Sequence, residues 1–180
     1  MYKGENPIAI ESMNWFAQAL LRLMKTMGYK DIIVRMLCKE ADLSRHTFYN
    51  LFKDKDEVLL YYLESSAKEY FDETNFCGEI KVHNFVESFS NYIDTHENLL
   101  RIIAENHMEF LLHQAIANEI NEVASLHAKT YKNPYGAAFL SGALTQIIIF
   151  WIYDENRISV EELTDIIEQI MMGKHYKIEQ

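Results

Sequence analysis

The spacing of apolar residues is helical along almost the whole chain, and no other feature of the sequence constrains the fold so strongly. Near the N-terminus the apolar residues recur every three or four positions and form one stripe of Met13, Phe16, Leu20, Leu23 and Met27. Only two prolines and six glycines interrupt 180 residues. We therefore predict an all-α protein of about nine helices.

Capping residues predict where several of these helices begin and end. Gly28 follows the first stripe and is expected to close that helix through a left-handed turn. Ser44 is expected to cap a short helix, and the pairs Asp54–Glu57 and Ser159–Glu162 have the spacing of capping boxes. In the C-terminal part the apolar pattern predicts helices over residues 82–95, 97–113, 115–131, 135–154 and 159–172.

The segment 135–154, which follows Pro134, is apolar nearly all round. Such a helix must be covered on both sides, and a chain of this length has few helices left to supply the second cover. With the apolar stripe of 159–172, it predicts a homodimer held by four helices, two from each subunit. An ordinary buried hairpin is the alternative. We expect no membrane partner, because polar residues such as Gln146 interrupt the apolar run.

Charge is distributed unevenly along the chain. The net charge is −10, yet residues 1–63 contain 9 Lys and Arg against 8 Asp and Glu. The acidity therefore lies in residues 64–180, and the near-neutral N-terminal part is able to face phosphates. We predict a domain boundary here, with one domain over residues 1–63 and a second, helical domain over residues 64–180; the family resemblance given below implies DNA binding for the first and effector binding and dimerisation for the second.

The stretch 33–55, IVRMLCKEADLSRHTFYNLFKDK, has the layout of a helix-turn-helix. The first residues of the second helix in that motif reach base edges in the major groove. Here these residues are Ser44, Arg45, His46 and Thr47, of which Arg45 is able to pair with guanine. Double-stranded DNA is therefore the predicted partner.

Three further residues extend this predicted DNA-binding surface. Tyr49 and Asn50 lie one helical turn beyond the first contacts and are within reach of phosphates or a base. Lys55 lies in the first turn of the next helix, where its charge and the helix dipole both favour a phosphate.

The same stretch resembles the helix-turn-helix of the TetR family of bacterial transcriptional regulators. The resemblance rests on Ala41-Asp42-Leu43-Ser44 in the turn, Thr47-Phe48-Tyr49 in the second helix and Phe52-Lys53-Asp54-Lys55 after it. It covers about residues 8–63. Two positions depart from the family pattern: Ile33 replaces a small hydroxyl residue, and Asp42 replaces the turn glycine.

The resemblance implies specific roles for these side chains. Thr47, Tyr49 and Lys55 would contact the DNA backbone, whereas Arg45, His46 and Asn50 would lie nearer the bases. Arg35 matches a position that often touches DNA in the family. The resemblance also implies a dimer whose two heads sit in successive major grooves of a palindromic operator, roughly 34–36 Å apart.

The predicted function is a repressor that a small-molecule ligand releases from its operator. An activator would share the same N-terminal domain. The main alternative is a nucleoid or cell-division factor of the same fold without an effector, and another is a protein-interaction module that no longer binds DNA. An enzyme is not expected, because the chain has no nucleophile elbow, phosphate loop or metal-binding pattern.

The effector, if bound, is expected to be apolar or aromatic, because 13% of the residues are aromatic and eight are Met. The candidate lining residues are Met108, Phe110, Phe139 and Trp151, with membership of the plain core as the alternative.

No cofactor and no metal are expected. The one pairing that the sequence suggests for a metal joins Glu109 and His113, one helical turn apart, and His96, His107 and His127 supply no evident third ligand. Cys38 and Cys77 predict no disulfide framework and are interpreted as small buried residues in a reduced cytoplasm.

Overall fold

A computed structural model describes residues 1–68, 70, 82–126 and 134–174. Cys77 and His127 lie outside the described residues. Within these ranges the chain is all-helical, with eight α-helices, one 3-10 helix and no strand, so the predicted fold class is confirmed. The elements are α1 (Pro7–Met24), η1 (Tyr29–Asp31), α2 (Val34–Ala41), α3 (Arg45–Leu51), α4 (Lys55–Lys68), α5 (Val82–Glu105), α6 (Glu109–Leu126), α7 (Pro134–Tyr153) and α8 (Val160–Met171).

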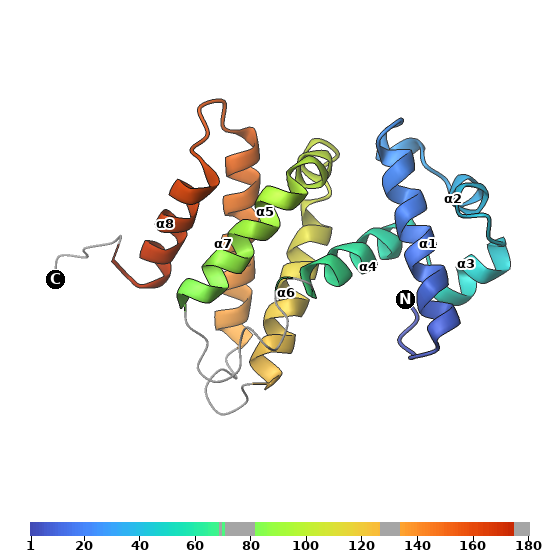
Figure 1. The fold of residues 1–180 in the computed structure, drawn as a ribbon, viewed down its shortest axis with the longest axis horizontal. Coiled ribbons are helices and arrows are strands. Elements are labelled where there is room, and N and C mark those ends of the chain that lie inside the picture. The colour runs from blue at the N-terminus through green and yellow to red at the C-terminus, as the bar shows by residue number, and fades with distance from the viewer. Residues whose placement is uncertain (69, 71–81, 127–133, 175–180) are drawn as a thin grey trace.

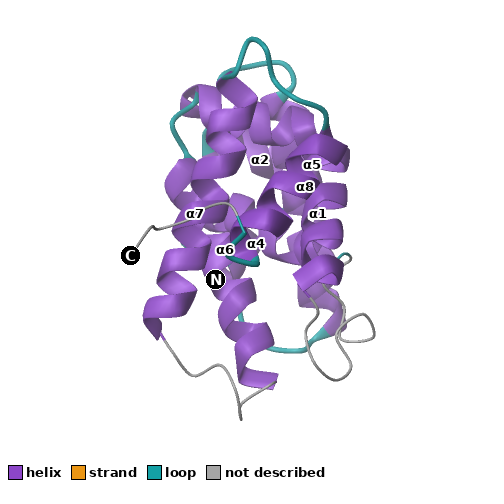
Figure 2. Ribbon diagram, turned by 90° about the vertical axis from the view of Figure 1, so that its left-hand side faces the viewer, coloured by secondary structure: helices purple, strands orange, loops and turns teal. Residues whose placement is uncertain are grey.

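The helices form two lobes that α4 joins (Figure 1). One lobe, the head, consists of α1, η1, α2 and α3, and the other, the body, consists of α5 to α8. Helix α4 packs on α1 at one end and on α6 at the other. In the perpendicular view the two lobes overlap, and the elements drawn are helices joined by loops (Figure 2). A single cluster of buried apolar residues runs through both lobes, so the head and the body share one continuous core.

Helix α1 buries the predicted stripe but ends earlier than expected. Asn6 caps its start, with Oδ1 accepting the Ile8 N–H at 3.0 Å, and Met13, Phe16 and Leu20 are buried. The helix ends at Met24, and the prediction of a left-handed Gly28 is wrong, because Gly28 is extended (φ −63°, ψ 142°) and precedes η1. The N–H groups of Thr26 and Met27 both bond to the Leu23 carbonyl, so the chain leaves the helix without a positive φ.

Three described helices end through a left-handed residue: α8 uses Gly173 (φ 69°), and the other two do so without glycine. Asp42 (φ 53°) follows α2, as the sequence predicted for this turn. His107 (φ 55°) follows α5 and was not anticipated. Both ends show the same pair of hydrogen bonds, for example from Met108 N to Ile103 O and from His107 N to Ala104 O, each 3.0 Å long. This is the Schellman arrangement, which satisfies the last carbonyls of a helix.

The turn at 106–108 corrects the predicted boundaries in the body. Three helices were expected over 82–95, 97–113 and 115–131, but α5 runs from Val82 to Glu105 and α6 from Glu109 to Leu126. The break predicted at 95–97 is a kink inside α5, where His96 has non-helical angles (φ −108°, ψ 15°). The break predicted near residue 114 is wrong, because the chain turns at 106–108 instead. Apolar periodicity missed this turn, since a left-handed residue other than glycine leaves no clear signal in the sequence.

The capping boxes behave as predicted at α8 and nearly so at α4. At α8, Ser159 and Glu162 exchange hydrogen bonds between side chain and backbone, 3.2 and 3.1 Å long. At α4, Asp54 Oδ1 accepts the Glu57 N–H at 3.0 Å, whereas the Glu57 carboxylate accepts the N–H of Lys53 instead of that of Asp54.

Candidate nucleic-acid interface

Helix α3 presents a polar face to solvent because its apolar face is firmly anchored. Phe48 is fully buried and meets Phe16 of α1 edge-to-face, with ring centroids 5.2 Å apart. Ser44 caps the helix as predicted, with Oγ accepting the Thr47 N–H at 3.0 Å and lying 2.9 Å from the Thr47 hydroxyl. This anchoring leaves four side chains of α3 exposed: Arg45, His46, Tyr49 and Asn50.

The exposed side chains of α3 support one another in pairs one turn apart. The Arg45 guanidinium lies over the Tyr49 ring, 5.9 Å from its centroid. The Asn50 amide nitrogen lies 3.2 Å from Nε2 of His46. These contacts restrict the rotamers of groups able to donate to bases or phosphates, which lowers the entropy lost when they bind.

Helix α2 supplies one more predicted residue at this surface. Arg35 is exposed in the first turn of α2. Ile33, the residue before that helix, is 55% exposed and makes no side-chain cap. The capping hydroxyl usual in the family is therefore missing, as the sequence indicated.

Lys55 differs from its prediction, because its ammonium is directed into the head. It donates to the carbonyls of Tyr29 at 2.6 Å, Ile32 at 2.8 Å and Lys30 at 3.4 Å, and it lies 4.4 Å from the Tyr29 ring centroid. These bonds engage all three donors of the ammonium. Burial lowers the pKa of Lys55, which fits a cation partly withdrawn from water. A phosphate contact by this residue stays a prediction, and only the fold brings residues 29–32 beside it.

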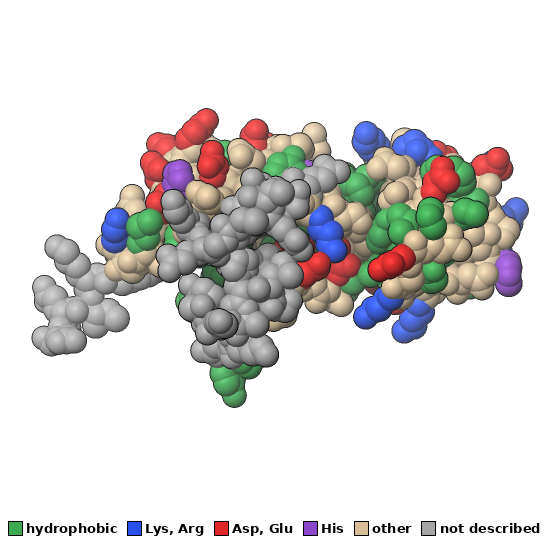
Figure 3. All heavy atoms as spheres, turned by 60° about the horizontal axis from the view of Figure 1, so that its bottom comes forward, with side chains coloured by type: hydrophobic (Ala, Val, Ile, Leu, Met, Phe, Trp, Pro, Cys, Tyr) green, Lys and Arg blue, Asp and Glu red, His purple; other side chains and the backbone are tan. Residues whose placement is uncertain are grey.

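Lys53, which the sequence analysis did not single out, is exposed next to this face of the head. No sequence signal separates it from Lys55, because the two lysines alternate with Asp54 and Asp56. The space-filling view shows Lys and Arg on several sides of the lobe formed by the head, whereas Asp and Glu predominate on the other lobe (Figure 3). This agrees with the charge division seen in the sequence.

Comparison with known proteins identifies the family. A family model described as the transcriptional regulator C-terminal region of TetR proteins matches residues 80–173, more than half of the chain. The chain belongs to the TetR family of transcriptional regulators. It is therefore a DNA-binding regulator of transcription. No curated protein sequence matches it.

Solved structures share the fold of this TetR-family protein. Lin0861 of Listeria innocua superposes with a TM-score of 0.77 at 14% identity, over 96% of each chain. A TetR transcriptional regulator of Streptococcus agalactiae has a TM-score of 0.58 at 13% identity, over 90% of this chain and 94% of that one. The dihydroxyacetone kinase operon activator DhaS has a TM-score of 0.57 at 21% identity, over 92% and 96%.

The four predicted effector-lining residues differ in exposure in this TetR-family protein, and their role in an effector site stays a prediction. Met108 and Trp151 are buried, whereas Phe110 and Phe139 are 59% and 76% exposed. The Trp151 Nε1–H donates to the Ile158 carbonyl at 2.8 Å, and the ring lies 4.4 Å from the Arg157 guanidinium, so Trp151 joins α7 to the start of α8. Met108 contributes to the core between the two lobes.

The exposed face of α7 carries aromatic residues. Tyr135, Phe139, Phe150 and Tyr153 are all more than half exposed, although the opposite face of the helix packs on α5 and α6. Gly142 lies in the same helix, and a Cβ added there would meet no atom within 4 Å. Among the described helices, α7 alone is long and apolar enough to cross a membrane, with a third of it buried. Exposed apolar surface of this kind marks an interaction site.

The predicted His and carboxylate pairing forms no metal site within the described ranges. No group of three or more His, Cys, Asp or Glu residues there is arranged to hold a metal ion. His113 instead lies 3.3 Å from the Ser141 hydroxyl and links α6 to α7.

Proposed function

We propose that this TetR-family regulator is a cytoplasmic, homodimeric repressor that binds a palindromic operator and leaves it when a small apolar or aromatic ligand binds the body. Residues 1–63 would bind DNA, and residues 64–180 would bind the effector and dimerise. The observation that carries the proposal is the exposed polar face of α3, held outward by the buried Phe48.

In this proposal Arg45, His46 and Asn50 read base edges from the major groove. Ser44, Thr47, Tyr49 and Arg35 contact the DNA backbone around them. Two contacts support these roles. Arg45 is held against Tyr49, and His46 is held against Asn50, in each case one helical turn further on.

The dimer would form through α7 and α8 of each subunit. Support comes from the exposed aromatic residues of α7 and from the open surface at Gly142, where a second helix is able to approach closely. A C2 axis through this surface would relate the two heads by the same symmetry as a palindromic operator.

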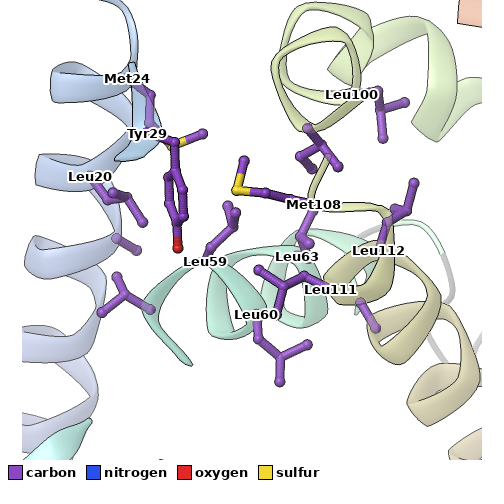
Figure 4. Packing of buried hydrophobic residues seen from close by; sticks show 14 of the residues in the cluster. Leu20, Met24, Tyr29, Leu59, Leu60, Leu63, Leu100, Met108, Leu111 and Leu112 are labelled. Atoms are coloured by element: carbon purple, nitrogen blue, oxygen red, sulfur yellow. The ribbon is translucent and has the colours of Figure 1, made fainter. Parts of the chain in front are cut away.

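Ligand binding would act on the heads through the contact between the lobes. Met108 extends from the turn between α5 and α6 toward Met24 and Tyr29 of the head, close to Leu59 of α4 (Figure 4). Tyr29 is itself held by α4, because its hydroxyl donates to Asp56 Oδ1 at 2.5 Å. A ligand that favours one position of this turn would shift the separation of the heads and lower DNA affinity by its preference between the two states.

A second candidate is a DNA-binding nucleoid or cell-division factor without a small-molecule effector. It is favoured by one observation: two of the four residues proposed for the effector site, Phe110 and Phe139, lie exposed on the surface of the body. Activation is a further possibility for the same head, since DhaS, a structural relative, is an operon activator. A non-enzymatic role without cofactor or metal is common to all of these functions.

Selection of bound duplexes from a random DNA library tests the proposal. We expect enrichment of a palindrome whose affinity collapses in the Arg45→Ala, Tyr49→Ala double variant, while circular dichroism and the oligomeric state stay unchanged. Lys39→Ala, an exposed lysine at the end of α2, is the matched control. Absence of any enriched DNA at low salt, with the protein folded and dimeric, would overturn DNA-binding regulation. Unfocused enrichment across many sequences would favour the nucleoid factor.

A further inference from the structure

A hollow of about 500 Å³ opens on the head between the first residues of the chain and the C-terminal end of α3. Its walls are formed by two segments far apart in the sequence. The lining residues are Met1, Tyr2, Tyr49, Asn50, Leu51, Phe52 and Lys53. It therefore adjoins the exposed face of α3 but extends beyond the residues assigned to base reading.

The N-terminal segment is fixed against α3 by its backbone. The Tyr2 N–H donates to the Leu51 carbonyl at 2.7 Å, which satisfies a carbonyl that the last residue of α3 would otherwise leave free. The Tyr2 side chain folds back over Gly4, where an added Cβ would collide with the phenol ring. One wall of the hollow is consequently positioned by the recognition helix itself.

The hollow offers donors suited to a phosphodiester. Lys53 is exposed and supplies a cation, and Tyr2 and Tyr49 carry hydroxyls that are able to act as neutral donors. The Glu57 carboxylate beside Lys53 pairs with the Met1 ammonium at 2.5 Å and accepts the Lys53 backbone N–H at 2.8 Å, so its charge is balanced by the first residue of the chain. Tyr49 lies at the same time beneath the Arg45 guanidinium. An anion in the hollow would thus lie next to the bases that Arg45 approaches.

We infer that this hollow binds a phosphate of the operator backbone, with Lys53 as its cation and Tyr2 and Tyr49 as its neutral donors. The inference rests on the proposed DNA binding and deepens it, since it gives the N-terminal segment a part in positioning α3 on the duplex. It also gives this side of the head an exposed cation, whereas the Lys55 ammonium is engaged by carbonyls inside the head. A backbone contact of this kind sets register and orientation without reading sequence.

Salt titration of the selected operator with Lys53→Gln tests the inference. Each dimer would lose two phosphate contacts, so the slope of log K against log salt should become less steep by about 1.8. Lys25→Gln is the control, because Lys25 is exposed just beyond the other end of α1 and removes the same charge from the head. Lys53→Arg should restore the slope of the unmodified protein.

Chemical change of the DNA then identifies the partner of Lys53. Replacing single phosphates of each half-site by neutral methylphosphonates should reveal one position where the substitution weakens the unmodified protein but not Lys53→Gln. Equal slopes for Lys53→Gln and Lys25→Gln, or additive losses at every phosphate, would overturn the hollow as a phosphate site while DNA binding stands. Failure of the unmodified protein to bind any DNA would overturn the proposed function, and the inference with it.

Discussion

The phenylalanine residues of the head are buried, whereas those on the outer face of α7 are exposed to solvent. In the head, Phe16, Phe48 and Phe52 are almost completely buried and pack edge-to-face or tilted against one another. On α7, Phe139 and Phe150 are 76% and 71% exposed. A folded chain rarely displays apolar rings so fully unless another surface covers them. One protomer therefore buries the phenylalanine rings of the head by itself, whereas those of α7 stay exposed, which supports the proposed dimer interface on this face.

The largest effect is expected from substitutions on the exposed face of α7, which should disrupt the dimer. The double variant Phe139→Asp, Phe150→Asp would place charges in the proposed dimer interface, so we expect monomers in analytical ultracentrifugation. Operator affinity should fall by about 10²–10⁴-fold, because each head then binds its half-site alone. Phe110→Asp changes an aromatic residue of α6 that is 59% exposed; it is the control and should leave the dimer intact. A dimer that persists in the double variant would place the interface elsewhere.

The next largest effect is expected from removing a buried ring of the head, which should lower the stability of the fold. Phe48→Ala would remove the ring that anchors α3, at a cost of about 3–5 kcal/mol in the free energy of unfolding. Urea denaturation followed by circular dichroism measures it. Tyr49→Ala, one residue further on and 53% exposed, should change the same quantity by less than about 0.5 kcal/mol. Similar losses in the two variants would contradict the assignment of buried and exposed faces on α3.

A smaller effect is expected at Lys55, where two measurements distinguish a structural role from contact with DNA. Lys55→Met would leave the carbonyls of Tyr29 and Ile32 without their donor and lower the free energy of unfolding by about 1–3 kcal/mol. The salt dependence of operator binding should stay unchanged, because the ammonium is used inside the head. A slope reduced by about 1.8 would instead establish the phosphate contact predicted from the family resemblance.

The smallest effect concerns the body. Burial raises the pKa of Glu119 in α6 to about 6, and repulsion from Glu122 and Glu64 adds to the shift against a partial offset by Lys68. Because the folded pKa exceeds the ordinary value near 4.5, the protonated form stabilises the fold at low pH. This contribution is lost as the pH rises through about 6. Since the side chain is partly exposed, solvent screening keeps the contribution below about 1 kcal/mol.

Glu119→Gln should therefore make the free energy of unfolding depend less on pH between pH 4.5 and pH 6.5. It should also raise that free energy slightly at neutral pH. Unfolding in urea at several pH values measures the effect. Glu161→Gln, an exposed carboxylate in the first turn of α8, serves as the control. An unchanged pH profile in Glu119→Gln would assign the titration to other groups.

Much of the helix-turn-helix was predictable because its signals are local. Ser44 caps α3, Asp42 adopts the left-handed turn, and Phe48 points inward, each as the spacing of residues 41–52 indicated. The bounds of α7 and the capping box of α8 were predicted for the same reason. Caps and apolar stripes are properties of a few neighbouring residues, so they can be read without the rest of the fold.

The features that the sequence could not predict depend on contacts between distant residues. The direction of the Lys55 ammonium is decided by carbonyls 23 to 26 positions away. The scattering of Met108, Phe110, Phe139 and Trp151 follows from how α5, α6 and α7 pack, and composition carries no information about it. Even the end of α5 at Glu105 depends on a left-handed histidine that nothing in the sequence singles out.

The sequence by itself determined that the chain is all-helical, where the helix-turn-helix lies and which side chains α3 turns outward, because helical period and capping act over one or two turns. The tertiary structure alone decided which surfaces remain open: the aromatic face of α7, the hollow beside Lys53 and the reach of Met108 into the head. Burial is a property of the packed chain, since each of these surfaces is defined by elements that meet only after folding.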